Sequence, residues 1–188
     1  YRYFETIPGA AEKVVYPFGY GLSYTTFDVE TVSAGVVNSN CTSETNKLYA
    51  KVRVTNTGKF SGKEVVQVYI AKPQGKLGKP AKELAAFEKT RELQPGESQL
   101  MILTWEINDM ASYDDLGKVK KSAYVLEAGS YDIYVGTSVR DVTKADYSYI
   151  LNHDVITEQL SAKLVPTSLP KRMLADGSYE ALPQSEPV

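Results

Sequence analysis

Short segments in which apolar and polar residues alternate recur along most of this 188-residue chain, and they restrict its fold more than any other feature. In the run 48–54 every second residue is apolar, which places one side of a strand in a core and the other in water. Similar strand patterns occupy 64–71, 99–107 and 130–138. Turn-forming residues such as Gln94-Pro95-Gly96-Glu97 separate these segments. Many strands divided by turns predict an all-β sandwich.

Several further segments are expected to complete this sandwich. Residues 26–37 and 146–151 have the composition of strands. Residues 121–127 and 130–138 are expected to pair as a hairpin. Residues 83–93 carry apolar residues three apart, as on a helix, but the neighbouring strands favour a strand with a bulge.

The two ends and one long connection differ from the strands. Residues 1–6 are expected to form a short strand or a connection, which Pro8-Gly9 ends. Residues 108–120 are expected to be a loop. Residues 155–165 are expected to form either a short amphipathic helix or an extended arm. The proline-punctuated stretch that follows is expected to be a tail or a linker without long regular structure.

The segment Gly129-Ser130-Tyr131 fits a tyrosine corner, in which a tyrosine early in a late strand donates its hydroxyl to upstream backbone and locks the crossover between sheets. The alternative is an ordinary strand tyrosine at the edge of the core. Cys41 is the only cysteine, so no internal disulfide forms. This excludes the disulfide-bearing immunoglobulin variant. The expected fold is a fibronectin type III-like (immunoglobulin-like) β-sandwich with an N-terminal arm and an extended C-terminal tail.

The run 16–27 concentrates aromatic residues, glycines and one proline. Pro17 stops a preceding element, while Gly19 and Gly21 allow the chain to turn sharply. The aromatic side chains can bury large areas, and each tyrosine keeps a polar tip that needs a partner. We therefore expect this run to press against a neighbouring domain. The predicted interface residues are Phe18, Tyr20 and Tyr24.

The stretch from Pro17 to Phe27 closely resembles the start of the fibronectin type III-like domain of glycoside hydrolase family 3 enzymes, the β-glucosidases and their relatives. Upstream, residues 1–6 look like the last piece of the family's α/β sandwich domain. Further matching motifs follow in the family's order: Val52–Gly58, Gly62–Tyr69, Lys82-Glu83-Leu84 with Phe87, Leu93–Ser98 and Gly129–Asp132. The resemblance covers about residues 1–150.

The resemblance implies a division of the chain into three parts. Residues 1–23 would be an arm, made of the end of a preceding α/β domain and the aromatic–glycine loop. Residues 24–151 would be the sandwich, and residues 152–188 a C-terminal tail or linker. In the common domain order of the family the β domain is last, whereas about forty residues follow it here. The resemblance therefore also allows a circularly permuted parent, in which this tail leads to the catalytic barrel.

The resemblance also implies a function. The chain would be an accessory structural domain that packs against the catalytic (β/α)8 barrel and the α/β sandwich domain of a β-glucosidase. The parent would hydrolyse terminal β-D-glucosyl residues by a retaining double displacement. No residue here matches the family's nucleophile or general acid. We therefore expect no catalytic residue, no cofactor and no metal site in this chain, and no activity of the chain alone.

Other chemistry is weakly supported by the residues themselves. Asp114 and Asp115 are adjacent in an expected loop, so they would face apart and be solvated, unlike the paired carboxylates of a glycosidase. His153 is the single histidine, and Cys41 has no nucleophile motif around it. The sequon Asn40-Cys41-Thr42 is taken as coincidental. The scattered aspartates, also expected to be solvated, are Asp141, Asp146 and Asp154.

Two alternatives from other functional classes stay open. The chain could be a carbohydrate-binding module that stacks sugars on aromatic side chains, or an independent adhesion or assembly domain. The candidate residues for stacking sugars are Tyr113, Trp105, Tyr147 and Tyr149. We favour a core position for Trp105 and sheet-edge positions for these tyrosines over an exposed sugar-binding surface. The loop Gly75–Lys82 could meet an anionic partner through its lysines, but a solvated charged loop is favoured; the lysines are Lys72, Lys76, Lys79 and Lys82.

The composition of the chain argues against nucleic-acid binding and against a transmembrane helix. The net charge of −2 gives no basic footprint for nucleic acid. No apolar run reaches the ~18 residues of a transmembrane helix, and the balance of 43% hydrophobic and 23% charged residues is that of a soluble globular protein. The amino terminus lacks a signal peptide and an initiator methionine, so a longer parent protein is expected and the compartment stays open.

Overall fold

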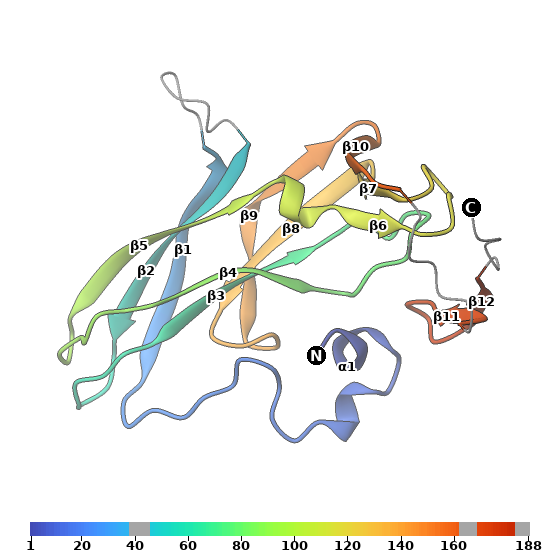
Figure 1. Cartoon of the computed structure of the whole chain (residues 1–188). Helices are drawn as coiled ribbons and strands as arrows, with labels where there is room; N and C mark the ends of the chain where they lie inside the picture. The colour runs from blue at the N-terminus through green and yellow to red at the C-terminus, as the bar shows by residue number, and fades with distance from the viewer. Residues whose placement is uncertain (38–45, 162–168, 183–188) are drawn as a thin grey trace.

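The computed structural model describes residues 1–37, 46–161 and 169–182, and it is a sandwich of antiparallel strands (Figure 1). One sheet has the order β1-β2-β5 and the other the order β4-β3-β8-β9. The strands of the two sheets are β1 (Phe27–Val36), β2 (Lys47–Asn56), β5 (Ser98–Glu106), β4 (Glu83–Lys89), β3 (Val65–Ala71), β8 (Gly129–Gly136) and β9 (Val142–Leu151). The fold class expected from the sequence is confirmed.

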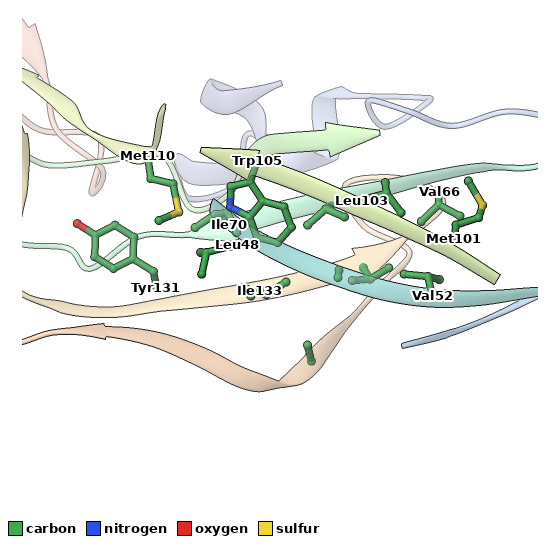
Figure 2. Packing of buried hydrophobic residues seen from close by; sticks show 14 of the residues in the cluster. Leu48, Val52, Val66, Ile70, Met101, Leu103, Trp105, Met110, Tyr131 and Ile133 are labelled. Atoms are coloured by element: carbon green, nitrogen blue, oxygen red, sulfur yellow. The ribbon is translucent and has the colours of Figure 1, made fainter. Parts of the chain in front are cut away.

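The core lies between the facing sides of these two sheets (Figure 2). Along β2, buried and less buried residues alternate from Leu48 to Val54, as the sequence predicts. Along β5 the buried side chains are Met101, Leu103 and Trp105. Trp105 is only 5% exposed, so it is a core residue. Burying side chains of this size stabilises a fold by about 1.5 to 3 kcal/mol each.

The ambiguous segment after residue 82 forms the edge strand β4, which pairs with β3. The register shifts between Val68 and Tyr69, so the predicted strand with a bulge is confirmed. The three-residue spacing of apolar residues resembles a helix because β4 is an edge strand and need not alternate strictly between buried and exposed residues. Its last three residues, from Phe87 to Lys89, are exposed instead of following a strict alternation.

The predicted hairpin between residues 121–127 and 130–138 is wrong. β7 (Ala123–Leu126) pairs with β6 (Ser112–Asp114) and β10 (Val155–Gln159) in a separate small sheet, whereas β8 belongs to the main sandwich. At this crossing between sheets, the Tyr131 hydroxyl donates a 2.9 Å hydrogen bond to the backbone carbonyl of Glu127. The predicted tyrosine corner is therefore present at the crossover.

A buried ion pair reinforces the same crossover. The Glu127 carboxylate pairs with the Lys79 ammonium and accepts hydrogen bonds from the backbone N–H groups of Lys76 and Leu77. Lys72 is also buried and pairs with Glu83. The expectation of a solvated lysine loop is therefore wrong for Lys72 and Lys79, because both lysines are buried and each ammonium group pairs with a carboxylate.

The N-terminal segment begins with a short helix, α1 (Arg2–Thr6), so the predicted strand or connection is wrong there. A single helical turn, η1 (Ala11–Lys13), follows. The Arg140 guanidinium holds α1 against the sandwich through Glu5, at 2.8 Å, and through the backbone carbonyl of Ala11. The Thr6 hydroxyl additionally accepts a hydrogen bond from the backbone N–H of Ala81. These tertiary contacts stabilise a helix too short to persist by itself.

The C-terminal stretch has more regular structure than expected. Of the two readings of residues 155–165, the described part is extended: it contains strand β10, not a helix. Strands β11 (Lys171–Met173) and β12 (Tyr179–Ala181) then form a small hairpin. Arg172 pairs with Glu180 inside this hairpin and with Asp115, which directly follows β6. The segment 108–120, expected to be a loop, contains η2 (Asn108–Met110) as well as β6.

Among the described residues, no helix has the length and apolar character needed to cross a bilayer.

Candidate functional site

Exposed apolar side chains gather on the arm that joins η1 to β1, which runs along one side of the sandwich (Figure 1). We call these residues the arm surface. Its members are Val15, Tyr16, Phe18, Tyr20, Leu22 and Tyr24. Leu22 is 87% exposed and Tyr24 is 96% exposed. Large apolar surface exposed in one contiguous segment is typical of an interaction site.

Gln67, on the outer face of β3, anchors the middle of the arm. Its side-chain amide donates to the carbonyl of Gly19 at 3.1 Å and to the carbonyl of Thr137 at 2.6 Å. Its side-chain oxygen accepts from the Tyr69 hydroxyl at 2.6 Å. Next to this contact, the backbone N–H of Val139 donates to the carbonyl of Phe18 at 3.0 Å. The arm is thereby fixed to buried polar groups of the sheet.

Gly19 is required at this anchor for two reasons. Its φ of +83° lies in the left-handed region that favours glycine. A Cβ atom at this position would lie 2.0 Å from the side-chain oxygen of Gln67. The close approach of the arm to the sheet therefore depends on the missing side chain.

A second anchor holds the end of the arm where it enters β1. The buried Thr25 hydroxyl donates to the side-chain oxygen of Asn56 at 2.7 Å. Asn56 is itself fully buried, and its amide donates to the carbonyls of Phe60 and Leu93, both at 2.8 Å. The residues from Tyr20 to Tyr24 thus lie between two fixed points.

Aromatic stacking orders the first half of the arm surface. The rings of Phe18 and Tyr1 stack with centroids 4.3 Å apart, and the rings of Tyr16 and Tyr20 stack at 5.2 Å. Tyr1 also contacts the ring of Tyr69 edge-on. Burial raises the pKa of Tyr69, whose hydroxyl stays protonated and continues to donate to Gln67. Stacked and hydrogen-bonded rings lose little further freedom when a partner covers them.

Phe87 extends this surface, although sequence reasoning did not select it as an interface residue. It is 68% exposed and pairs directly with Gln67 across β3 and β4. Residues directly opposite in an antiparallel pair point to the same face. Its ring therefore lies on the face that carries the arm. The signal that could have identified Phe87 is an apolar residue on the outward face of an edge strand, where a polar residue is expected.

A cavity of about 470 Å³ opens between the arm and the end of β3. Tyr20 and Leu22 line it on one side, and Lys63, Glu64 and Asp141 line it on the other. Burial raises the pKa of Glu64 above its ordinary value. The arm therefore presents apolar side chains beside a hollow that has both charge signs.

The three sequence-predicted interface residues lie together on the arm surface. Phe18 and Tyr20 are about half exposed, and Tyr24 is almost fully exposed. Phe18 lies at the first anchor, and Tyr20 and Tyr24 lie between the two anchors. Their role as interface residues stays a prediction.

Asp114 differs from its expected place in a solvated loop, because it is fully buried. Its carboxylate accepts four backbone hydrogen bonds from residues 117–120, at 2.7 to 3.1 Å. Burial by itself would raise the pKa of Asp114, but these four donors lower it below its ordinary value. Its neighbour Asp115 pairs with Arg172. Both carboxylates therefore organise loops, and they do not face each other across a cleft.

The remaining candidates are dispersed. His153 is exposed, Tyr147 and Tyr149 are half-buried, and Tyr113 is exposed beside Tyr124. Asp154 accepts a hydrogen bond from the backbone N–H of Ala128, Asp141 accepts one from the Thr137 hydroxyl, and Asp146 is exposed. Cys41 and the sequon at 40–42 lie outside the described residues. Within the described ranges no three potential ligands cluster as a metal site.

Comparisons with known proteins agree with the fold. Residues 64–139 match the Fibronectin type III-like domain family. The chain is 61% identical over its whole length to beta-glucosidase A of Butyrivibrio fibrisolvens and 42% identical over 99% of its length to a beta-glucosidase of Ruminococcus albus. A beta-glucosidase structure from Paenibacillus barengoltzii superposes on 99% of the chain with a TM-score of 0.89 and 42% identity.

The chain spans only part of these proteins. It covers 24% of the Butyrivibrio protein, 19% of the Ruminococcus protein and 21% of the Paenibacillus chain. The rest of each relative has no counterpart in these 188 residues.

Proposed function

We propose that this chain, which carries the fibronectin type III-like domain of family 3 β-glucosidases, serves as a structural brace for the catalytic domains of such an enzyme. The arm surface would pack against those domains and fix their relative position. The observation that supports this most is an apolar segment held rigidly between two buried anchors while its side chains remain exposed.

The partners would be the (β/α)8 barrel and the α/β sandwich domain of the parent. Residues 1–23 would form the arm, residues 24–151 the sandwich, and residues 152–188 the tail or linker. Phe18, Tyr20 and Tyr24 would contact the partner, with Phe87 beside them. The cavity lined by Tyr20 and Asp141 would receive a side chain of the partner. Preorganisation of the arm would reduce the entropy that docking costs.

The hydrolysis of terminal β-D-glucosyl residues with retention would take place in the partner domains. The roles of Asp114 and Asp115 in fixing loops support this division of labour. The tail would lead toward a further domain in a permuted parent, and the hairpin β11-β12 would fix its direction.

The purified chain should show no turnover of an aryl β-glucoside. The control is a β-glucosidase of the same family assayed under identical conditions. Turnover that co-purifies with the chain and persists after removal of contaminating glycosidases would contradict the proposal.

A further inference from the structure

The C-terminal hairpin of β11 and β12 has no core of its own. None of the residues 169–182 is buried, and Figure 1 shows the hairpin outside the two main sheets. Each of its strands has only three residues. A two-stranded hairpin by itself is at best marginally stable in water. The hairpin therefore depends on its contacts with the rest of the chain.

Four side chains of alternating charge join the hairpin to the segment that follows β6. The Arg172 guanidinium pairs with the Asp115 carboxylate at 3.0 Å, and the Lys118 ammonium pairs with the Glu180 carboxylate at 2.5 Å. Arg172 and Glu180 lie opposite each other in the hairpin and pair at 2.6 Å. We call these four residues the ion latch. Two of its three ion pairs cross from the hairpin to the segment 115–118.

The side chains of the ion latch are only partly shielded from water. Their exposed fractions range from 21% for Arg172 to 39% for Asp115. Hydrogen bonds from Lys118 and Arg172 hold the pKa of Glu180 below its ordinary value, so this carboxylate is charged at neutral pH. Partly exposed ion pairs change an equilibrium by only about 1.4- to 5-fold each, and salt weakens them. The attachment is therefore weak enough to open while the sandwich stays folded.

The half of the ion latch that lies outside the hairpin has a firm support. Lys118 belongs to the run 117–120, whose backbone N–H groups donate to the buried carboxylate of Asp114. Asp115 is the next residue after Asp114. Both partners of the hairpin are thus fixed to a buried group. The ion latch therefore opens by departure of the hairpin, and the run 117–120 stays in place.

On its other side the hairpin tip approaches the N-terminal segment without filling the space between them. Leu174 of the tip lines a cavity of about 190 Å³ together with Thr6, Ile7 and Pro80. A Cβ added to Gly177, whose φ is +85°, would lie 3.5 Å from the Cγ2 atom of Ile7. The tip therefore rests against this segment beside an open gap, and apolar packing there does little to prevent its departure.

We propose that the hairpin β11–β12 is a detachable strap, which the ion latch holds closed and which opens as one unit while the sandwich and the arm remain folded. The consequence for a parent enzyme rests on the proposed function. In the closed state the strap would fix the direction in which residues 152–188 lead to a further domain. In the open state the same residues would form a longer tether between the domains.

Hydrogen exchange at two backbone N–H groups of the hairpin measures the open population. The N–H of Leu174 donates to the carbonyl of Ser178, and the N–H of Leu182 donates to the carbonyl of Pro170. A detached hairpin of this length does not keep its hydrogen bonds. Exchange at both groups therefore reports how often the strap opens.

The double variant Asp115→Asn with Lys118→Gln removes both ion pairs that cross to the hairpin and leaves the hairpin sequence intact. It removes one charge of each sign, so the net charge is unchanged. Exchange at Leu174 and Leu182 should become about 2- to 25-fold faster than in the wild type. Raising the ionic strength from about 0.01 M to about 1 M should accelerate wild-type exchange and change the double variant much less.

The matched control is Glu30→Gln with Arg53→Gln, which removes an exposed ion pair between β1 and β2 and also preserves the net charge. It should leave exchange in the hairpin unchanged. The N–H of Val139, which donates to the arm, should exchange equally slowly in all three proteins.

Three outcomes would overturn this inference. They are unchanged exchange at Leu174 and Leu182 in the latch variant, wild-type exchange that does not respond to salt, and an equal acceleration at Val139. The last of these would mean that the whole domain loosens instead of the strap. Because the hairpin groups do not report on the arm, failure of the strap would leave the proposed docking untouched, and failure of docking would leave the strap in place.

Discussion

Replacement of Gly19 by alanine should release the arm from the sandwich. The residue has a φ of +83°, which costs an alanine about 1 to 2 kcal/mol. The new Cβ would also lie 2.0 Å from the side-chain oxygen of Gln67. Gln67 can move only by giving up hydrogen bonds to Gly19, Thr137 and Tyr69, each worth about 0.5 to 1.5 kcal/mol. We therefore expect the arm to open more easily by about 2.5 to 6.5 kcal/mol.

Hydrogen exchange at the backbone N–H of Val139 measures this opening, because that group donates to the carbonyl of Phe18. A loss of about 2.5 kcal/mol corresponds to about 70-fold faster exchange. Gly21→Ala is the matched control, since Gly21 has no positive φ and a Cβ there meets nothing within 4 Å. Unchanged protection of Val139 in Gly19→Ala, or an equal loss in Gly21→Ala, would refute the anchoring by Gln67.

Two further predictions concern the sandwich itself. Tyr131→Phe should lower the free energy of unfolding, measured in urea, by about 1 to 3 kcal/mol, because the buried carbonyl of Glu127 loses its donor. The control is Tyr149→Phe: Tyr149 lies opposite Tyr131 across the strands and has no described hydroxyl hydrogen bond, so this change should cost much less. Equal losses in the two variants would contradict the tyrosine corner. Asp114 has a lowered pKa, so its stabilisation is present above its unfolded pKa of about 4 and is lost as pH falls through the folded value. Asp114→Asn should therefore flatten the acid limb of the stability–pH curve, and an unchanged limb would contradict this role.

Patterns with a period of two residues correctly predicted the strands, because strand formation depends mainly on residues that are close together in the sequence. The alternation from Leu48 to Val54 marks β2 because each side chain sees only one face of a sheet. Tyr131 was equally readable, since its hydroxyl bonds to backbone only four residues upstream. Local signals of this kind identify strands and corners, but they do not say which strands share a sheet.

The errors come from contacts between distant residues. β7 and β8 are sequence neighbours, yet Glu127 between them is held by Lys76 and Lys79, about fifty residues upstream, and the chain crosses to the other sheet. Similarly, Asp114 is buried because the loop at 117–120 folds its backbone N–H groups around the carboxylate. Nothing in the local sequence distinguishes such a carboxylate from a solvated one.

The arm has one feature that the sequence predicted and one that it did not. Its aromatic and glycine composition predicted a surface that should press against a neighbour. The anchor at Gln67 was not predicted, because a glutamine within a strand pattern gives no sign of its partners at Gly19 and Thr137. The exposure of Phe87 likewise depends on its place at a sheet edge.

The docking role of the arm surface can be measured in a chimera that places this chain in the matching region of the Butyrivibrio beta-glucosidase A. Leu22→Ser combined with Tyr24→Ser should leave the unfolding of the isolated chain almost unchanged, because both side chains are exposed in it. In the chimera the same pair should lower the thermal midpoint by several degrees, since each buried apolar side chain contributes about 1.5 to 3 kcal/mol. Ile102→Ser, an exposed apolar change on β5, is the control.

Thermal unfolding of the chimera, followed together with its β-glucosidase activity, is the decisive measurement. We predict that the Leu22 and Tyr24 pair destabilises the chimera and not the isolated chain, while the Ile102 control affects neither. Equal midpoints for the chimera with and without the pair would contradict a bracing role for the arm surface.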